Sequence, residues 1–212
     1  RPSNTNAMAL GKYLTFRNAI DLIPVTSQWQ ILHPRHAGYS DEELKTLYDV
    51  FSTNGFDTTG WNTFPAGALL NGVSTTGYTT HPLGNPNTNA SSPLMRFSFE
   101  VETELDGIVL ETCRANGFVV YLDGKEVYQY NVTKEPRYSA LAEDNTTWRF
   151  SPVIYSLPIE VSQGKHTLGI SIHTRDVGGL AYLRHTRLIG FTSAILTDTT
   201  DLPSEVLTGK LM

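Results

Sequence analysis

The fold is decided by the stretch NGFVVYLDGKEVY, residues 116–128. Two runs of β-branched and aromatic residues flank Asp123-Gly124, and such runs are typical of β-strands. Asp-Gly accepts the positive φ angles that a type I′ turn requires at its two central positions. The stretch therefore predicts a tight antiparallel hairpin in a β-rich chain.

The same pattern continues on both sides of this hairpin. Alternating runs between turn signals predict strands at Gln28–Leu32, Leu94–Glu102, Gly107–Arg114, Gly117–Leu122, Lys125–Asn131, Phe150–Val161, Lys165–Thr174 and Leu180–Thr192. Without long crossover helices, this many strands predict an all-β fold, an antiparallel two-sheet jelly-roll sandwich.

One short helix is expected before these strands. Ser40-Asp41-Glu42-Glu43 forms a capping box, and apolar residues follow it at helical spacing: Leu44, Leu47, Tyr48 and Phe51. Repeated glycines and prolines between residues 54 and 93 break regular structure, so this segment is predicted to be mostly loop.

Composition limits the class of the protein. The 212 residues are 40% hydrophobic, which is enough for one folded domain with extended arms. The net charge of -5, with no basic block, argues against nucleic acid as a partner. No apolar run is long enough to predict a membrane span. We expect a sandwich over residues 28–192, an N-terminal arm over 1–27 and a C-terminal tail over 193–212.

Residues 116–128 also carry a family resemblance, together with Phe56–Trp61, Phe64–Gly67, Arg96–Phe99, Gly164–Leu168 and Ile170–His173. These stretches resemble galactose-binding-like jelly rolls, similar to carbohydrate-binding modules, that accompany secreted phosphoesterases and glycoside hydrolases. The resemblance covers about residues 28–192 and implies an accessory, non-catalytic module. It implies no cofactor here, since Ala115-Asn116 stands where such modules often carry an acidic pair, which leaves calcium binding unsupported.

Catalytic motifs are absent from the sequence: it has no HExxH, GxSxG, GxxxxGK[ST], CxxC or EF-hand pattern. Glu100, Glu102 and Glu104 alternate and are interpreted as a solvated strand face, with a glycosidase-type carboxylate pair as the alternative. The histidines lack acidic or cysteine partners at zinc-site spacing, so no metal site is predicted. Cys113, the only cysteine, is expected to be a small buried residue. The sequence thus predicts that the chain is not an enzyme.

Carbohydrate binding is one function that the residues allow. An exposed aromatic ring stacks on the apolar face of a sugar while polar groups satisfy the hydroxyls. The candidates are Trp61, Tyr128, Tyr130, Trp148 and Tyr182, with Arg149 and Asp176 as polar partners. The alternative interpretation places the same aromatic residues in the core of the sandwich.

Self-assembly is the function that the sequence favours, because the N-terminal arm carries much apolar side chain ahead of the sandwich. Its apolar residues are Tyr13, Leu14, Phe16, Ile20, Leu22, Ile23 and Val25. An extended arm of about 24 residues reaches about 80 Å, and a sandwich of this size is only about 40 Å wide. We expect the arm to add a strand to a neighbouring jelly roll and build a filament, or the tail to do so. The alternative is an arm that folds back on its own sandwich.

An extracellular or cell-surface location is expected from three Asn-X-Ser/Thr sequons, at Asn89, Asn131 and Asn145, which fall in or beside predicted loops. The first residues, Arg1-Pro2, suggest removal of an upstream segment. The sequence therefore predicts a glycosylated structural subunit of a fibre or surface appendage. A carbohydrate-binding module, free or attached to a secreted enzyme, is the alternative.

Overall fold

The computed structural model describes residues 8–10, 14–17, 19–34, 37–65, 67–69, 93–114, 116–143, 149–157, 159–175 and 182–196. Its strands are β1 (Met8–Leu10), β2 (Leu14–Arg17), β3 (Ile20–Ile23), β4 (Gln28–Leu32), β5 (Asn62–Pro65), β6 (Gly67–Leu69), β7 (Leu94–Val101), β8 (Gly107–Arg114), β9 (Gly117–Leu122), β10 (Lys125–Tyr130), β11 (Arg149–Leu157), β12 (Gly164–His173), β13 (Tyr182–Phe191) and β14 (Ser193–Leu196). The helices are α1 (Asp41–Val50) and the short 3-10 helix η1 (Arg137–Ser139).

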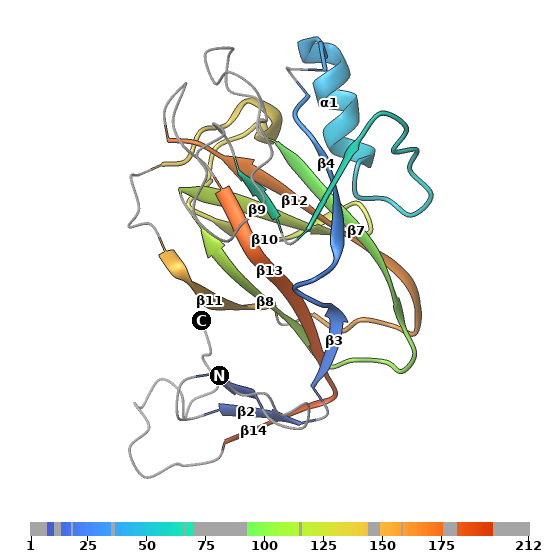
Figure 1. Ribbon diagram of the computed structural model, residues 1–212, viewed down its shortest axis with the longest axis vertical. Helices are drawn as coiled ribbons and strands as arrows, with labels where there is room; N and C mark the ends of the chain where they lie inside the picture. The colour runs from blue at the N-terminus through green and yellow to red at the C-terminus, as the bar shows by residue number, and fades with distance from the viewer. Residues whose placement is uncertain are drawn as a thin grey trace.

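Two antiparallel sheets form the body of the molecule (Figure 1). One has the strand order β10-β9-β12-β7-β4-β5, and the other has the order β11-β8-β13-β3, with β6 also paired to β13. The core between them is apolar and includes Trp29, Ile31, Met95, Phe118, Leu168 and Leu188. The predicted all-β sandwich is confirmed.

The hairpin from which the fold was read joins β9 to β10. Asp123 has a φ of 50° and Gly124 a φ of 85°, the signs that a type I′ turn requires. Inward positions of β9, such as Phe118 and Val120, enter the core, and the outward Val119 and Tyr121 lie under the helix. The sequence prediction for this element is confirmed.

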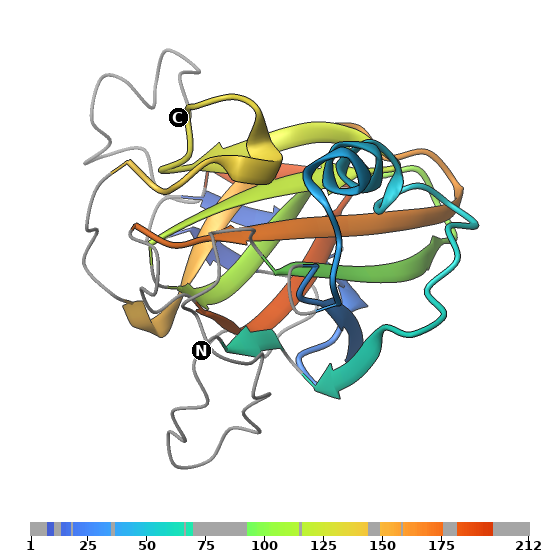
Figure 2. The same ribbon diagram turned by 90° about the horizontal axis from the view of Figure 1, so that it is seen from above.

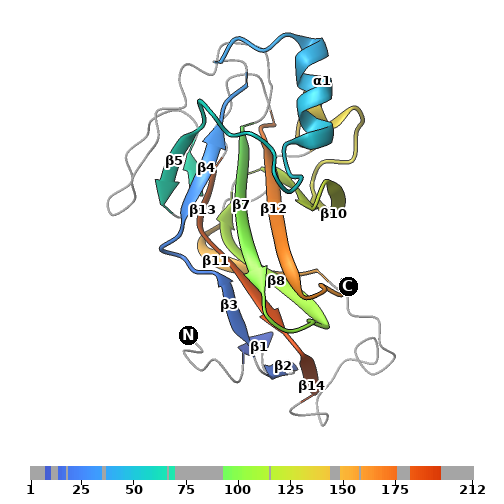
Figure 3. The same ribbon diagram turned by 90° about the vertical axis from the view of Figure 1, so that its right-hand side faces the viewer.

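Helix α1 covers one end of the outer face of the six-stranded sheet (Figures 2 and 3). The capping box is formed: the Ser40 backbone N–H donates to the Glu43 carboxylate at 2.7 Å, and Glu43 N–H donates to the Ser40 hydroxyl at 3.4 Å. The apolar side of the helix packs on the sheet through Leu47, Tyr48 and Phe51. Gly169 of β12 permits this approach, because a Cβ there would lie 2.4 Å from the Cβ of Ser52.

The strands of the N-terminal arm pair within the chain. β2 lies between β1 and β14 in a separate three-stranded sheet, at the opposite end of the molecule from α1 (Figure 3). β3 joins the sandwich beside β13, where Ile23 is fully buried and Asp21 forms an ion pair with Arg187. The boundary expected at residue 27 is thus corrected, since residues 20–23 supply a strand of the sandwich.

Strands β5 and β6 are short elements inside the segment that was predicted to be mostly loop. β5 pairs with β4 and β6 pairs with β13, so partner strands supply order that the local sequence does not encode. Residues 70–92 of that segment lie outside the described part of the chain. Cys113 is buried, as predicted. Among the described residues, neither helix has the length and apolar character needed to cross a membrane.

Candidate functional site

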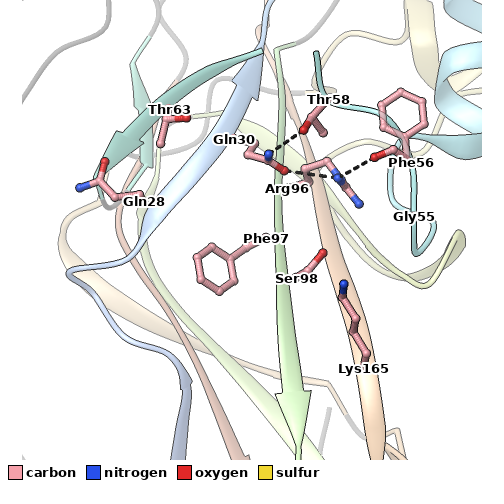
Figure 4. Close-up of a pocket in the computed structure, with 10 residues that line it drawn as sticks. All are labelled: Gln28, Gln30, Gly55, Phe56, Thr58, Thr63, Arg96, Phe97, Ser98 and Lys165. Atoms are coloured by element: carbon pink, nitrogen blue, oxygen red, sulfur yellow. Dashed lines mark hydrogen bonds between the residues drawn. The ribbon is translucent and has the colours of Figure 1, made fainter. Parts of the chain in front are cut away.

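A hollow of about 430 Å³ opens on the outer face of the six-stranded sheet, next to the loop that follows α1 (Figure 4). Strands β4, β5, β7 and β12 form its floor, and residues 55–58 form one wall. Its described lining residues are Gln28, Gln30, Gly55, Phe56, Thr58, Thr63, Arg96, Phe97, Ser98 and Lys165.

Strand alternation explains why this part of the sheet is polar. On β4, Trp29 and Ile31 point into the core, so Gln28 and Gln30 stand on the outer face. The strand register places Gln30 between Thr63 of β5 and Arg96 of β7. Polar groups from adjacent strands therefore lie side by side in one row across the sheet.

Arg96 fixes the wall of this hollow, which we call the outer-face groove. Its guanidinium donates to the Thr53 carbonyl at 2.9 Å and the Phe56 carbonyl at 3.4 Å. Its Cζ also lies 5.6 Å from the centre of the Phe56 ring. Only 4% of Arg96 is exposed, and burial lowers its pKa, although an arginine remains charged at neutral pH. The loop is thereby held in place on the sheet.

Gln30 adds a second anchor to the same wall. Its amide Nε2 donates to the Thr58 hydroxyl at 2.6 Å, and its Oε1 accepts from Arg96 at 3.3 Å (Figure 4). Gln28, Thr63, Ser98 and Lys165 are exposed, so they can reach a bound molecule. The groove thus has a preformed wall and a floor of accessible polar groups.

A hydrogen-bond network beside the groove ties the β9–β10 turn to the loop after α1. Asn54 donates to the Asp123 carboxylate at 3.2 Å and accepts from the Thr167 hydroxyl at 2.6 Å. The other oxygen of Asp123 lies 2.6 Å from Nδ1 of His166. Since Nε2 of His166 lies 2.8 Å from the Ser162 carbonyl, both ring nitrogens already have partners. This pair therefore positions backbone and leaves no ring nitrogen for catalysis.

Three of the aromatic residues predicted to bind sugar have described side chains, and none of the three is a lining residue of the groove. Trp61 is half-buried and packs edge-on against Phe56, 5.9 Å between ring centres. Tyr128 and Tyr130 pack with Phe118 and Tyr155 at the end of the core. These two tyrosines are half-buried and pack against the core, and Trp61 reaches the groove only through the Phe56 ring that it contacts.

The remaining predicted sugar ligands are described only in part. Arg149 lies opposite Arg114 on β8, and Tyr182 lies opposite Leu69 on β6, as the backbone register shows. Trp148 and Asp176 lie outside the described residues. The groove residues were missed because their signal is a polar residue at alternate strand positions, which a solvated strand face also shows.

One of the three predicted glycosylation sites lies among the described residues. Asn131 directly follows β10, with a φ of 55°, and is half-buried, and Asn89 and Asn145 lie outside the described residues. Within the described part of the chain, no group of three or more His, Cys, Asp or Glu side chains could hold a metal ion. Glu100 is exposed on β7, but the strand ends at Val101, ahead of Glu102 and Glu104.

A second hollow, of about 480 Å³, lies between α1 and η1. Arg137 dominates it, donating to both carboxylate oxygens of Glu126 at 3.0 and 2.8 Å and to the Val132 carbonyl at 2.8 Å. Its hydrogen bonds to Glu126 raise the pKa of Arg137. Because Arg137 and Glu126 pair with each other, we interpret them as structural residues rather than as binding groups for a ligand.

Comparison with solved structures finds similarity to beta-glucuronidases and to a glycosyl hydrolase. Ruminococcus gnavus beta-glucuronidase is 12% identical with a TM-score of 0.45, over 86% of this chain and 30% of that chain. An uncultured Clostridium sp. beta-glucuronidase is 10% identical with a TM-score of 0.43, over 87% and 30%. A glycosyl hydrolase family 2 member from Bacteroides cellulosilyticus DSM 14838 is 7% identical with a TM-score of 0.39, over 78% and 20%.

The chain therefore spans less than a third of the length of these enzymes. With TM-scores below 0.5, the similarity assigns no activity to it. No protein-family model matches the sequence, and no curated protein matches it significantly.

Proposed function

We propose that this chain is a non-catalytic module that binds carbohydrate in the outer-face groove. The observation that carries the proposal is the row of amide and hydroxyl side chains on the groove floor, next to an anchored wall. Amides and hydroxyls both donate and accept hydrogen bonds, as sugar hydroxyls require. The Phe56 ring, held by Arg96 and Trp61, adds an apolar surface in the wall.

Preorganisation supports binding at this position. The side chains of Gln30 and Arg96 are hydrogen-bonded to the loop after α1 rather than to water. The wall of the groove therefore needs no rearrangement when a ligand binds. The exposed Gln28 remains to contact the ligand, and Ser98, whose hydroxyl lies 2.9 Å from the Thr167 hydroxyl, can still accept from a sugar hydroxyl. The expected affinity is modest, because the groove is open and its exposed side chains must be ordered on binding.

The chemistry of the lining favours binding over catalysis. Its described residues include no Asp, Glu, His or Cys, the usual acids, bases and nucleophiles. The two carboxylates that retaining or inverting glycosidases use have no counterpart among them. A module whose groove has this lining would bind a sugar for a catalytic domain, or attach the protein to a sugar-bearing surface, rather than cleave the sugar.

Screening the full chain on a glycan array, followed by calorimetry with the best ligand, tests the proposal. The double variant Gln28→Ala/Ser98→Ala removes two exposed floor groups and should weaken binding about tenfold. The matched control is Ser162→Ala/Gln163→Ala, which changes the same residue types at exposed positions of the turn before β12. No sugar binding at millimolar concentration, or an equal loss in the control, would contradict the proposal.

Filament formation, the function that the sequence favoured, gains no support from the pairing of the strands. β2 pairs with β1 and β14, and β3 pairs with β13 of the same chain. An extracellular location remains a proposal that rests on the sequons. Mass spectrometry of the native protein before and after glycosidase treatment would test it at Asn89, Asn131 and Asn145.

A further inference from the structure

The charges in the outer-face groove are unbalanced. Arg96 and Lys165 bring two positive charges to it, and its described lining residues include no carboxylate. Lys165 is exposed on β12, and Figure 4 shows its side chain beside Ser98. Among the described residues, no ion pair forms with either Lys165 or Arg96.

Asp57 and Asp123, two carboxylates close to the groove, are engaged elsewhere. Asp57 accepts from the backbone N–H and the hydroxyl of Thr59, at 2.9 and 2.7 Å, and these bonds lower its pKa. Asp123 accepts from the Thr167 backbone N–H at 2.8 Å and from Asn54. Glu100 lies opposite Lys165 in the strand register but does not line the groove.

Arg96 supplies a fixed part of this field. Its Nη atoms serve loop carbonyls, which carry only partial charges, and its buried Nε has no hydrogen-bond partner among the described residues. A cation that is 4% exposed and lacks a carboxylate partner is poorly screened by water. It therefore raises the positive potential at the floor, where Lys165 is the accessible cation.

We propose that the groove prefers a carbohydrate with an anionic substituent, a uronate carboxylate or a sulfate ester, held against the ammonium of Lys165. This inference rests on the proposed carbohydrate binding and specifies its ligand class. The whole chain has a net charge of -5, so general electrostatics would repel a polyanion. A preference for acidic glycans would therefore report the local charge of the groove.

Paired glycans that share a backbone test the inference. An array carries uronate oligosaccharides beside their methyl esters, and sulfated oligosaccharides beside their desulfated forms. Calorimetry then compares the members of the best pair. We expect the anionic member to bind at least tenfold tighter at low salt, as a charge-assisted hydrogen bond implies, and this advantage to shrink as salt is added. The pair that shows the preference distinguishes carboxylate from sulfate.

Lys165→Met supplies the residue-specific test, because it keeps the aliphatic stem and removes the charge. It should abolish the preference for the anionic member over the neutral member. Lys125→Met, at an exposed position of the edge strand β10, is the matched control and should retain the preference. Equal binding of neutral and anionic members, or equal loss in both variants, overturns this inference but not carbohydrate binding. Absence of binding to every glycan overturns the proposed function.

Discussion

His173 is a buried histidine that must be neutral to fit its surroundings. It lies on β12, and its side chain is fully enclosed. Nδ1 lies 2.8 Å from the Ala140 carbonyl, which can only accept, so this nitrogen carries the hydrogen. Nε2, 2.8 Å from the Ser171 hydroxyl, is then the acceptor. Burial lowers the pKa of His173 from 6.5 to about 4.

This depressed pKa predicts an acid-dependent loss of stability. Between pH 6.5 and 4, the unfolded chain binds a proton at residue 173 that the folded chain excludes, so stability falls as the pH is lowered through this window. Stability is expected to be on the order of 2 to 3 kcal/mol lower at pH 4.5 than at pH 7 from this group alone. Urea unfolding of the wild type and of His173→Gln at both pH values measures the contribution.

The variant His173→Gln serves as its own reference, because glutamine can donate and accept hydrogen bonds but does not titrate. Other groups with acid-sensitive pKa values act equally in both proteins, so only the difference between their pH dependences matters. If the two proteins lose the same stability between pH 7 and 4.5, protonation of His173 does not oppose folding.

At the scale of elements, the contact between α1 and β12 sets the position of the groove wall. The wall begins where the helix ends, and Gly169 leaves room for Phe51 and Ser52 above the sheet. A Cβ at position 169 would lie 2.4 Å from the Ser52 Cβ and 2.8 Å from the Phe51 ring. The backbone cannot yield easily there, since Gly169 pairs with both β7 and β9.

Gly169→Ala is therefore expected to push α1 away from the sheet. Overpacking of this kind costs about 1 to 3 kcal/mol in unfolding free energy, and the displaced loop should also weaken ligand binding. Ser40→Ala is the control, because it loses about 1 kcal/mol by removing the N-cap at the other end of the helix. Chemical unfolding and calorimetry on both variants provide the measurements. Unchanged ligand binding in Gly169→Ala would show that the position of α1 does not determine binding in the groove.

The elements that could be predicted from the sequence are those with strong local patterns. β8, β9 and β4 have the bounds that alternation predicted, and the capping box at Ser40 placed α1. β3, β5 and β6 are three or four residues long and are flanked by prolines or glycines. Such strands form because they pair with a neighbouring strand in the sheet. The residues of that neighbouring strand are distant in the sequence, so a local pattern does not predict the pairing.

The groove was less predictable than the fold for a related reason. A carbohydrate site was expected from aromatic residues. A large aromatic ring, however, contributes more to the stability of a sandwich when it is buried than when it is exposed. Tyr128 and Tyr130 accordingly pack around Phe118. The polar positions that line the groove, such as Gln28 and Ser98, border a hollow because the loop after α1 stands beside them on the sheet.

At the scale of the whole molecule, strand β3 of the N-terminal segment belongs to the sandwich. Ile23 of β3 is fully buried in the core, and Ile20, three residues earlier in the same strand, is 45% exposed. Ile23→Ala should therefore lower the unfolding free energy by about 2 to 5 kcal/mol. Ile20→Ala is the matched control and should cost well under half as much. Equal effects in a urea titration would mean that β3 does not pack on the body.

Pairing of the arm within one chain also predicts how stability depends on protein concentration. An arm exchanged between copies would make folding and association a single reaction, so the unfolding midpoint would rise with concentration. Here β2 and β3 find their partners, β14 and β13, in the same chain. We expect the midpoint to stay constant over a hundredfold range of concentration, and light scattering to give a mass close to 23.5 kDa plus any attached glycan. A midpoint that climbs with concentration, together with a larger mass, would restore strand exchange as the organising contact of the molecule.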